Sequence, residues 1–287
     1  MPLTFTEYLQ QKKYSQKTVA TYGFYIKRFL SWLESENLSP ESFTYTDVLE
    51  YMSDCQGKGI TKRTVHNMLG MIRHYSNYLI TEKRRTDNPA AGVFIKGLVR
   101  KLPSGLLNFE ELEELYKQYS IQLNVERSKK ILFGLMVYQG TSVAELMRIT
   151  AQDIGLKEGK IKIKGTKRTN ERILNLNANQ MLAIQQYILE NKFKEGALFT
   201  ELTKTKNSKR NINNRIRYML RQLKQLNDKV TSANQIRSSV ITHWLALNNL
   251  RQVQYMAGHK YVSSTQRYQV NNLDDLKNEL QRHHPMS

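Results

Sequence analysis

The chain has 287 residues, and its 44 lysines and arginines against 25 aspartates and glutamates give a formal net charge of +19 at pH 7. Such an excess of one charge repels itself in a compact fold and indicates a polyanionic partner, so nucleic acid is the expected ligand. A content of 40% hydrophobic residues with only 5 prolines argues against a disordered chain. The length suffices for about two domains.

Several classes of protein are excluded by what the sequence lacks. A lone cysteine, Cys55, is incompatible with an internal disulfide framework or a cysteine-based zinc cluster, and is typical of a reducing compartment. The six histidines show no spacing that gathers metal ligands, and no P-loop motif is present. The first twenty residues contain no signal-peptide pattern, and no run approaches the ~20 apolar residues that cross a bilayer. We therefore expect a cytoplasmic, nucleic-acid-binding protein without metal or cofactor.

The first ninety residues predict a bundle of helices. Apolar residues recur at helical spacing in three stretches, of which the first follows Ser15, the expected N-cap, and the third follows Thr61. The residue before Pro89 is pushed away from the α region, which ends the helical pattern. We therefore predict a helical domain over residues 1–89 and a connection between two domains over residues 90–105.

The rest of the chain, residues 106–287, predicts a mainly helical domain with a small sheet. Helices are expected over 109–119 and 131–139, and throughout the part after Asn177. Residues 158–176 alternate isoleucine with lysine and then reach a basic turn, which predicts an antiparallel β-hairpin. The expected fold class is therefore mainly α, with an N-terminal helical bundle and an α-rich second domain that contains a small antiparallel β-sheet.

Two segments near the carboxyl end carry a specific resemblance: Gln235-Ile236-Arg237-Ser238-Ser239 and Ala257-Gly258-His259-Lys260-Tyr261-Val262-Ser263-Ser264-Thr265-Gln266-Arg267-Tyr268. They are similar to the C-terminal half of the catalytic domain in the tyrosine recombinase (phage integrase) family. In that family a His-x-x-Arg segment precedes a Gly-His segment, and the nucleophilic tyrosine follows nine residues after the second histidine. Arg237, His259 and Tyr268 fall on these positions.

The similarity extends over nearly the whole chain. The segment Gly140–Leu146 resembles the region of the family's first active-site arginine, and the predicted hairpin matches the place of its catalytic lysine. The N-terminal bundle resembles the family's SAM-like core-binding domain. The resemblance thus implies a core-binding domain over 1–89 and a catalytic domain with a C-terminal helical tail over 106–287.

The resemblance also implies a reaction. In this family a tyrosine hydroxyl attacks the scissile phosphate, forms a 3′-phosphotyrosyl link, and allows strands to exchange through a Holliday junction without metal or ATP. Tyr268 would be the nucleophile, Arg237 would clamp the phosphate with its planar fork, and His259 would act as a phosphate donor or acid–base helper. An integrase or transposon recombinase of a mobile element is the implied class.

The pattern departs from the family at three places. Ser142 stands at the position of the first arginine, and Asn234 replaces the histidine three residues before Arg237. The position of the catalytic lysine is blurred by extra residues in the turn; Lys164 matches it best, with Lys167 and Arg168 as rivals. Either the site is inactive, or another cation replaces the lost arginine. The candidates for that replacement are Lys162, Lys167, Arg168 and Arg172.

Contacts with DNA are expected from basic residues, namely Lys96, Arg100, Lys101, Lys209, Arg210 and Arg215. The stretch Leu273, Leu276, Leu280 predicts an amphipathic tail helix, which in this family docks on a neighbouring protomer and implies a homotetramer on DNA; the alternative is that it packs on its own domain. A DNA-bending accessory protein is a further expected partner. Two other functions stay open: a recombinase-fold regulator that binds DNA without cutting it, and a relaxing topoisomerase of the IB kind.

Overall fold

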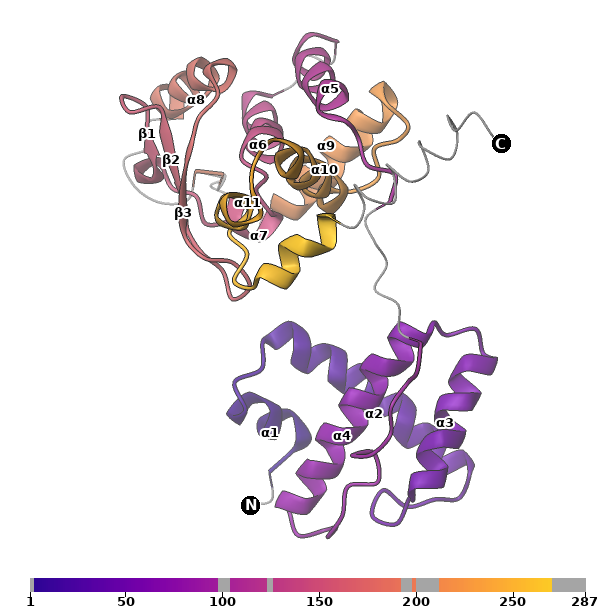
Figure 1. The fold of residues 1–287 in the computed structure, drawn as a ribbon. Helices are drawn as coiled ribbons and strands as arrows, with labels where there is room; N and C mark the ends of the chain where they lie inside the picture. The colour runs from indigo at the N-terminus through magenta and orange to yellow at the C-terminus, as the bar shows by residue number, and fades with distance from the viewer. Residues whose placement is uncertain (1–2, 98–103, 123–125, 192–197, 200–211, 270–287) are drawn as a thin grey trace, which may run out of the picture. The chain divides into compact units, whose positions relative to one another are not determined.

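The computed structural model describes residues 3–97, 104–122, 126–191, 198–199 and 212–269 (Figure 1). The chain divides into two compact units, Met1–Arg100 and Lys101–Ser287. Helices dominate both units in these ranges, and the second unit also contains a small antiparallel sheet. The predicted fold class is therefore confirmed. None of the described helices combines the length and the apolar character needed to cross a membrane.

The N-terminal unit consists, in its described part, of four helices, each of which begins after a serine or threonine: α1 (Phe5–Gln11), α2 (Gln16–Ser35), α3 (Tyr45–Gly57) and α4 (Lys62–Thr81). The hydroxyls of these N-cap residues, Ser15 among them, accept a hydrogen bond from the third residue of the helix and so satisfy a backbone N–H that has no helical partner. The three predicted helices are confirmed. Helix α1 is an addition, because seven residues are too few for a clear periodicity.

Aromatic rings fill the core of this unit. Phe29 of α2 meets Phe43 and Tyr51 edge-on, with ring centroids 5.2 and 5.0 Å apart. Ala90 and Val93 are also buried in this core, and Arg73 Nε donates to the Ala90 carbonyl oxygen at 2.9 Å. The first residues of the expected connection, 90–105, therefore belong to the packed N-terminal unit rather than to a solvated linker.

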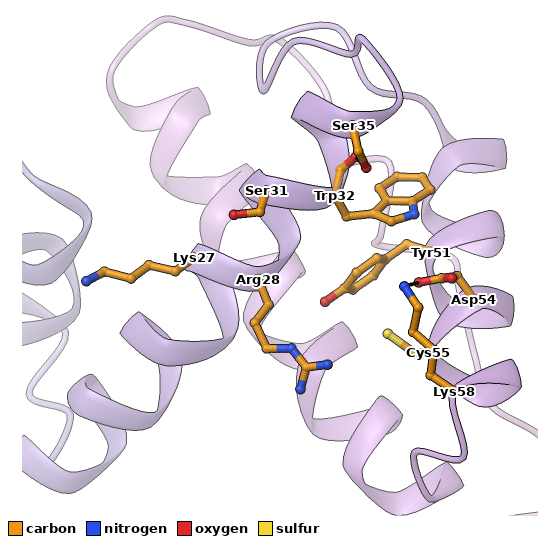
Figure 2. A pocket seen from close by; sticks show the side chains of 9 residues that line it. All are labelled: Lys27, Arg28, Ser31, Trp32, Ser35, Tyr51, Asp54, Cys55 and Lys58. Carbon is orange, nitrogen blue, oxygen red and sulfur yellow. Dashed lines mark hydrogen bonds and ion pairs between the residues drawn. The ribbon is translucent and has the colours of Figure 1, made fainter.

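Helices α2 and α3 line an open pocket of about 400 Å³, which is rich in cations (Figure 2). Lys58 is paired there with Asp54 at 2.7 Å, whereas Lys27 and Arg28 make no ion pair with any residue that the structure describes. The pocket is lined by Lys27, Arg28, Ser31, Trp32, Ser35, Tyr51, Asp54, Cys55 and Lys58.

In the second unit, α6 (Arg127–Tyr138) is the central helix, and it packs against α5, α8, α9 and α10. A run of seven residues from Ile131 to Val137 is buried, which is why the stretch reads as continuously apolar. The other described helices of this unit are α5 (Phe109–Gln122), α7 (Val143–Leu146), α8 (Ala178–Asn191), α9 (Ile212–Leu226), α10 (Ala233–Leu247) and α11 (Leu250–Ala257), with a 3₁₀ turn, η1 (Ala151–Asp153), and helical residues at 262–269.

The sheet has three strands in the order β1 (Ile154–Gly155), β2 (Lys160–Ile163) and β3 (Arg172–Asn175), all antiparallel. The predicted hairpin is confirmed, and β1 is an addition to it. The register pairs Ile163 with Arg172 and Lys162 with Ile173. Because directly paired residues share a face of the sheet, Arg172 lies on the buried face with Ile163, and Lys162 lies on the exposed face.

Candidate active site

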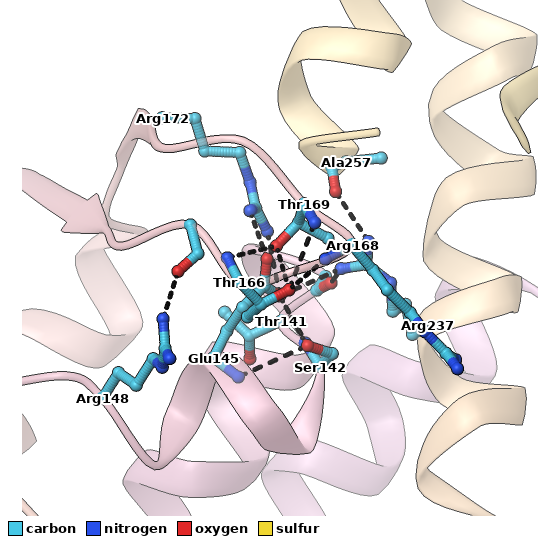
Figure 3. Close-up of polar contacts among 12 residues, drawn as sticks. Thr141, Ser142, Glu145, Arg148, Thr166, Arg168, Thr169, Arg172, Arg237 and Ala257 are labelled. Atoms are coloured by element: carbon cyan, nitrogen blue, oxygen red, sulfur yellow. Dashed lines mark hydrogen bonds and ion pairs between the residues drawn. The ribbon is translucent and has the colours of Figure 1, made fainter. Parts of the chain in front are cut away.

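Glu145 forms the buried centre of the candidate site, on the short helix α7. Ser142 is the N-cap of this helix, and its backbone N–H and its hydroxyl both donate to Glu145 Oε2, at 2.8 and 2.9 Å. Two arginines from other parts of the chain reach the same carboxylate (Figure 3): Arg172 Nη1 lies 2.6 Å from Oε1, and Arg237 Nη1 lies 3.3 Å from Oε2. One carboxylate therefore holds two guanidinium groups in one place.

The charge state of Glu145 follows from these neighbours. Burial alone would raise the pKa of the carboxyl, because the charged form loses its hydration. The hydrogen bond and the charge of Arg172, followed by the charge of Arg237, outweigh burial and lower the pKa of Glu145 to about 2. The carboxylate is therefore ionised at neutral pH, and the cluster carries one negative and two positive charges.

Arg172 enters the cluster from strand β3, and its side chain is fully buried. The guanidinium passes beside Gly258, where a Cβ atom would lie only 2.5 Å from Arg172 Nη1. Gly258 also has a left-handed backbone, with φ of 67°, so that a glycine is required there for two separate reasons. Arg172 Nε makes no hydrogen bond to any described residue, so one N–H of the guanidinium stays unsatisfied within the described structure.

Arg237 closes the other side of the cluster from helix α10. Besides its contact with Glu145, it donates to the carbonyl oxygens of Gly140 and Ala257, the latter at 2.6 Å. Burial lowers the pKa of Arg237, and the negative charge of Glu145 opposes this change. A guanidinium keeps its proton in proteins, so Arg237 supplies a fixed positive charge.

His259 and Tyr268 lie next to each other just beyond α11. The His259 Nδ1 atom is 2.8 Å from the hydroxyl of the buried Thr265, and the imidazole stacks on the Tyr268 ring, with centroids 6.1 Å apart and planes 10° apart. Tyr268 belongs to helical residues 262–269 and is 8% exposed. The phenol and the imidazole are thus held as one packed pair.

The protonation of His259 is set by the same surroundings. Burial is the main cause that lowers its pKa, and the positive charges of neighbouring arginines, Arg237 foremost, add to it. The resulting pKa of about 4 means that His259 is a neutral imidazole near pH 7. A neutral imidazole can accept a proton at one ring nitrogen and donate one from the other.

Two other basic residues of the hairpin are paired with carboxylates other than Glu145. Lys164 Nζ lies 2.9 Å from Asp153 Oδ2, and Lys162 Nζ lies 2.9 Å from Glu171 Oε1. Lys167 and Arg168 are exposed in the turn. Of the four candidates for replacing the missing arginine, Arg172 is the one that reaches Glu145.

The two substituted positions differ in their surroundings. Ser142, which was predicted to stand at the position of the family's first arginine, caps helix α7 and donates to Glu145. Asn234 is exposed on the first turn of α10, one turn before Arg237. Since residues three apart share a helix face, the Asn234 amide and the Arg237 guanidinium leave α10 on the same side.

The predicted DNA contacts lie in different surroundings. Lys96 is exposed, whereas Arg215 is 8% exposed and its Nη2 atom lies 3.9 Å from Glu126. A DNA contact at either residue stays a prediction. The remaining predicted contacts and the tail helix lie outside the described residues: Arg100, Lys101, Lys209, Arg210, Leu273, Leu276 and Leu280.

Glu145 and Thr265 were not selected by the sequence-based interpretation as members of the site. A signal for Glu145 is present, because a serine followed three residues later by a glutamate is the pattern of a capping box, which fixes the glutamate at the start of a helix. For Thr265 the sequence offers only its place shortly before Tyr268. Among the residues that the structure describes, no group of three or more His, Cys, Asp or Glu side chains is arranged to hold a metal ion.

The full sequence is similar to those of curated recombinases. It is 24% identical over 282 residues to tyrosine recombinase XerD of Pasteurella multocida, covering 96% of this chain and 94% of the relative. It is 27% identical over 297 residues to tyrosine recombinase XerC of Bacillus subtilis, covering 98% of this chain and 95% of the relative.

Solved structures share the fold. The XerH site-specific recombinase bound to palindromic difH substrate superposes with a TM-score of 0.72 at 19% identity, covering 91% of this chain and 78% of that one. A lambda integrase tetramer bound to a Holliday junction superposes with a TM-score of 0.67 at 16% identity, covering 92% and 74%. Residues 4–83 match the phage integrase N-terminal SAM-like domain, and residues 106–274 match the phage integrase family. The resemblance inferred from the motifs is thereby confirmed, and the chain belongs to the phage integrase family.

Proposed function

We propose that the chain is a tyrosine-type site-specific DNA recombinase that cuts and rejoins strands through a covalent 3′-phosphotyrosyl intermediate and a Holliday junction. One observation carries the proposal: two buried guanidinium groups, those of Arg172 and Arg237, meet at Glu145, and the stacked pair of His259 and Tyr268 follows directly after Gly258. The names of the relatives support the same function, because they are tyrosine recombinases.

The proposed reaction is a transesterification at phosphorus. The Tyr268 oxygen forms a bond to the scissile phosphorus, the bond from phosphorus to the 5′-oxygen breaks, the phenol loses its proton, and the 5′-oxygen gains one. The neutral His259 is suited to accept or donate a hydrogen bond at the phosphate, with its Nδ1 side fixed by Thr265. The phosphodiester energy stays in the tyrosyl linkage, so rejoining by the reverse reaction requires no ATP.

Arg172 is proposed to replace the arginine that the family has at the position of Ser142. The transition state has excess negative charge on its phosphate oxygens and is stabilised by cations that are already in place. Arg172 provides such a cation from the buried face of the sheet. Its unsatisfied Nε–H is buried, so the groups that cover it must move when DNA binds before it can donate to a phosphate oxygen. The buried carboxylate of Glu145, shared with Arg237, fixes where this cation lies.

The proposed catalytic lysine remains Lys164, with Lys167 as its rival. In the DNA-free structure Lys164 is held by Asp153 and lies 3.3 Å from the Thr150 hydroxyl. For Lys164 to donate a proton to the 5′-oxygen, this ion pair must open when DNA binds. Lys167 is already exposed and needs no such change.

The N-terminal unit is proposed to contact the DNA backbone through its unpaired cations. Lys27 and Arg28 at the pocket between α2 and α3, together with the exposed Lys96, are the described residues on which this proposal rests. Phosphate contacts by such residues make binding depend on salt. Replacing Arg28 by glutamine is expected to reduce the slope of log affinity against log salt by about one, measured by fluorescence anisotropy.

Assembly into a tetramer on DNA is proposed by analogy with the lambda integrase tetramer on a Holliday junction. The tail after residue 271 would carry the contact between protomers. Deleting residues 272–287 and measuring assembly by native gel shift tests this, because a tail that packs on its own domain leaves tetramer formation unchanged. A DNA-bending accessory protein would act at the level of this assembly.

The deciding experiment is covalent trapping on nicked duplexes. Duplexes with randomised cores are first selected for binding to the native protein, because the target sequence is unknown, and are then nicked so that cleavage releases a short strand. The native protein is expected to form a DNA adduct that resists denaturation, and Tyr268→Phe to form none. Tyr218→Phe, which alters an exposed tyrosine on α9, is the matched control and should form the adduct. Selected binding without any adduct from the native protein would favour the DNA-binding regulator instead.

A further inference from the structure

Strand β3 is the last strand of its sheet, so the peptide groups on its outer edge have no partner strand. At Ile173 a single side chain forms hydrogen bonds with both the N–H and the C=O group of this edge. The Ile173 N–H donates to the Tyr255 hydroxyl at 3.1 Å, and this hydroxyl donates to the Ile173 carbonyl oxygen at 3.3 Å. The ring of Tyr255 remains 54% exposed on α11, so the contact acts through the hydroxyl rather than through burial of the ring.

A second attachment joins the hairpin to the end of α11, on the other side of Arg172 in the sequence. The Asn170 N–H donates to the Gly258 carbonyl oxygen at 2.8 Å, and Thr169 forms an isolated antiparallel bridge with His259. This attachment consists of backbone groups. Arg172 therefore lies between two attachments of the hairpin to α11 and its end, and the one made by a replaceable side chain is that of Tyr255.

The position of Arg172 depends on where β3 lies along α11. Its guanidinium runs against Gly258, with no room for even a Cβ atom, and its buried side chain leaves the strand on the face opposite to that of Ile173. Arg237, by comparison, comes from the second turn of a helix of fifteen residues, whereas β3 has four. An arginine on so short an edge strand needs an external support.

We propose that Tyr255 is a positioning residue for Arg172, which it controls by fixing the backbone of β3 at the adjacent Ile173. The inference rests on the proposed function, since it concerns the placement of a cation at the scissile phosphate. It concerns only the Tyr255 hydroxyl, whose hydrogen bonds go to the backbone of Ile173 and not to Arg172. A displacement of ~1 Å in such a group is enough to slow a reaction by about a hundredfold.

The test compares Tyr255→Phe with Tyr218→Phe. Tyr218 is a matched control because it is 52% exposed in the same unit and its hydroxyl makes no hydrogen bond to a described residue. At saturating DNA, we expect Tyr255→Phe to form the covalent adduct at least about tenfold more slowly, with DNA affinity and melting temperature close to native. Tyr218→Phe should keep the native rate. An unchanged rate in Tyr255→Phe overturns the proposal.

A double-mutant cycle shows whether Tyr255 acts through Arg172. Residues that act through one group are not additive, so Tyr255→Phe should slow cleavage no further in an Arg172→Lys background. The same slowing factor in both backgrounds contradicts the proposal. If Arg172→Lys does not fold, the nitrogen-15 resonance of Arg172 Nε is compared between the native protein and Tyr255→Phe without DNA; a shift is expected, and identical resonances overturn the idea.

The experiments distinguish failure of the proposed recombinase function from failure of the proposed role of Tyr255. If the native protein forms no adduct on any selected duplex, the proposed recombinase function fails, and the Nε resonance still reports whether Tyr255 positions Arg172. If the native protein forms the adduct and Tyr255→Phe matches it, the recombinase function stands and the positioning role is lost.

Discussion

Both units of the chain bury aromatic rings, but they differ in the charged groups that they bury. The N-terminal unit packs aromatic rings such as Phe29 and Phe43, and each of its described ion pairs has at least one partner that is well exposed. The second unit buries Glu145 and Arg172 completely, with Arg237 beside them. Moving a charged group from water into a protein interior costs free energy. A buried ion pair is therefore weak evidence that the pair stabilises the fold, and a functional role is the better explanation for it. Within the described residues, the comparison therefore shows a completely buried ion pair in the second unit and none in the first.

The largest expected effect is that of removing the shared carboxylate. Glu145→Ala leaves two buried guanidinium groups without their counter-charge, which should cost about 3–5 kcal/mol of unfolding free energy. Urea denaturation followed by circular dichroism measures this loss. The matched control is Glu41→Ala in the N-terminal unit, which removes an exposed ion pair with Arg84 and should cost no more than ~1 kcal/mol. If Glu145→Ala and Glu41→Ala lost the same unfolding free energy, the proposed difference between the two units would be wrong.

Next in size is the effect of Arg172 on cleavage. Arg172→Lys keeps a positive charge but loses the planar fork, and we expect adduct formation to slow by about a hundredfold or more. Single alanine variants of the exposed candidates, Lys162, Lys167 and Arg168, serve as comparisons. If all four variants keep the full rate in the trapping assay, Arg172 is not the replacement for the arginine that Ser142 displaced.

A smaller effect concerns pH. The pKa of His259 is lowered from its ordinary 6.5 to about 4 in the folded protein, so the unfolded chain binds this proton more readily. Its contribution to stability is complete above about pH 6.5 and is lost as the pH falls toward 4. Melting temperatures of the native protein and His259→Gln across this window test the sign: the native protein should lose stability relative to the variant on acidification. A constant difference would contradict the buried, neutral imidazole.

The smallest effect comes from two helix caps that can be compared directly. Ser142→Ala and Thr44→Ala each remove a capping-box hydroxyl, one in each unit, and each should cost about 0.5–2 kcal/mol by thermal denaturation. In Ser142→Ala alone the cap also holds the carboxylate of Glu145, which binds Arg172 and Arg237, so a drop in cleavage of less than about tenfold is expected there, and none at saturating DNA in Thr44→Ala. A larger drop would give Ser142 a direct catalytic role.

Much of the helical architecture could be predicted because it depends on local patterns. Short stretches of sequence, each with a clear spacing of apolar residues, predict the N-cap at Ser15, the helix after Thr61 and the hairpin at 158–176. The part of the expected connection that packs into the N-terminal core was missed, because burial of Ala90 and Val93 depends on tertiary contacts.

The site was only partly predictable for a similar reason. The motif gave Arg237, His259 and Tyr268, but the sequence alone left four basic candidates for the missing arginine. What separates them is the register of β2 against β3, which puts Arg172 on the buried face and Lys162 on the exposed one. A shift by one residue would have exchanged these faces, and no local signal in the sequence fixes it.

An uncovered edge of a β-sheet is a template on which other chains can add strands and aggregate. Strand β3 is the edge of this sheet, and Ile173 projects an exposed apolar side chain from it. The Tyr255 hydroxyl already occupies both peptide groups at that residue. An incoming strand would have to displace the phenol and break both of these hydrogen bonds before it could pair with β3 at Ile173.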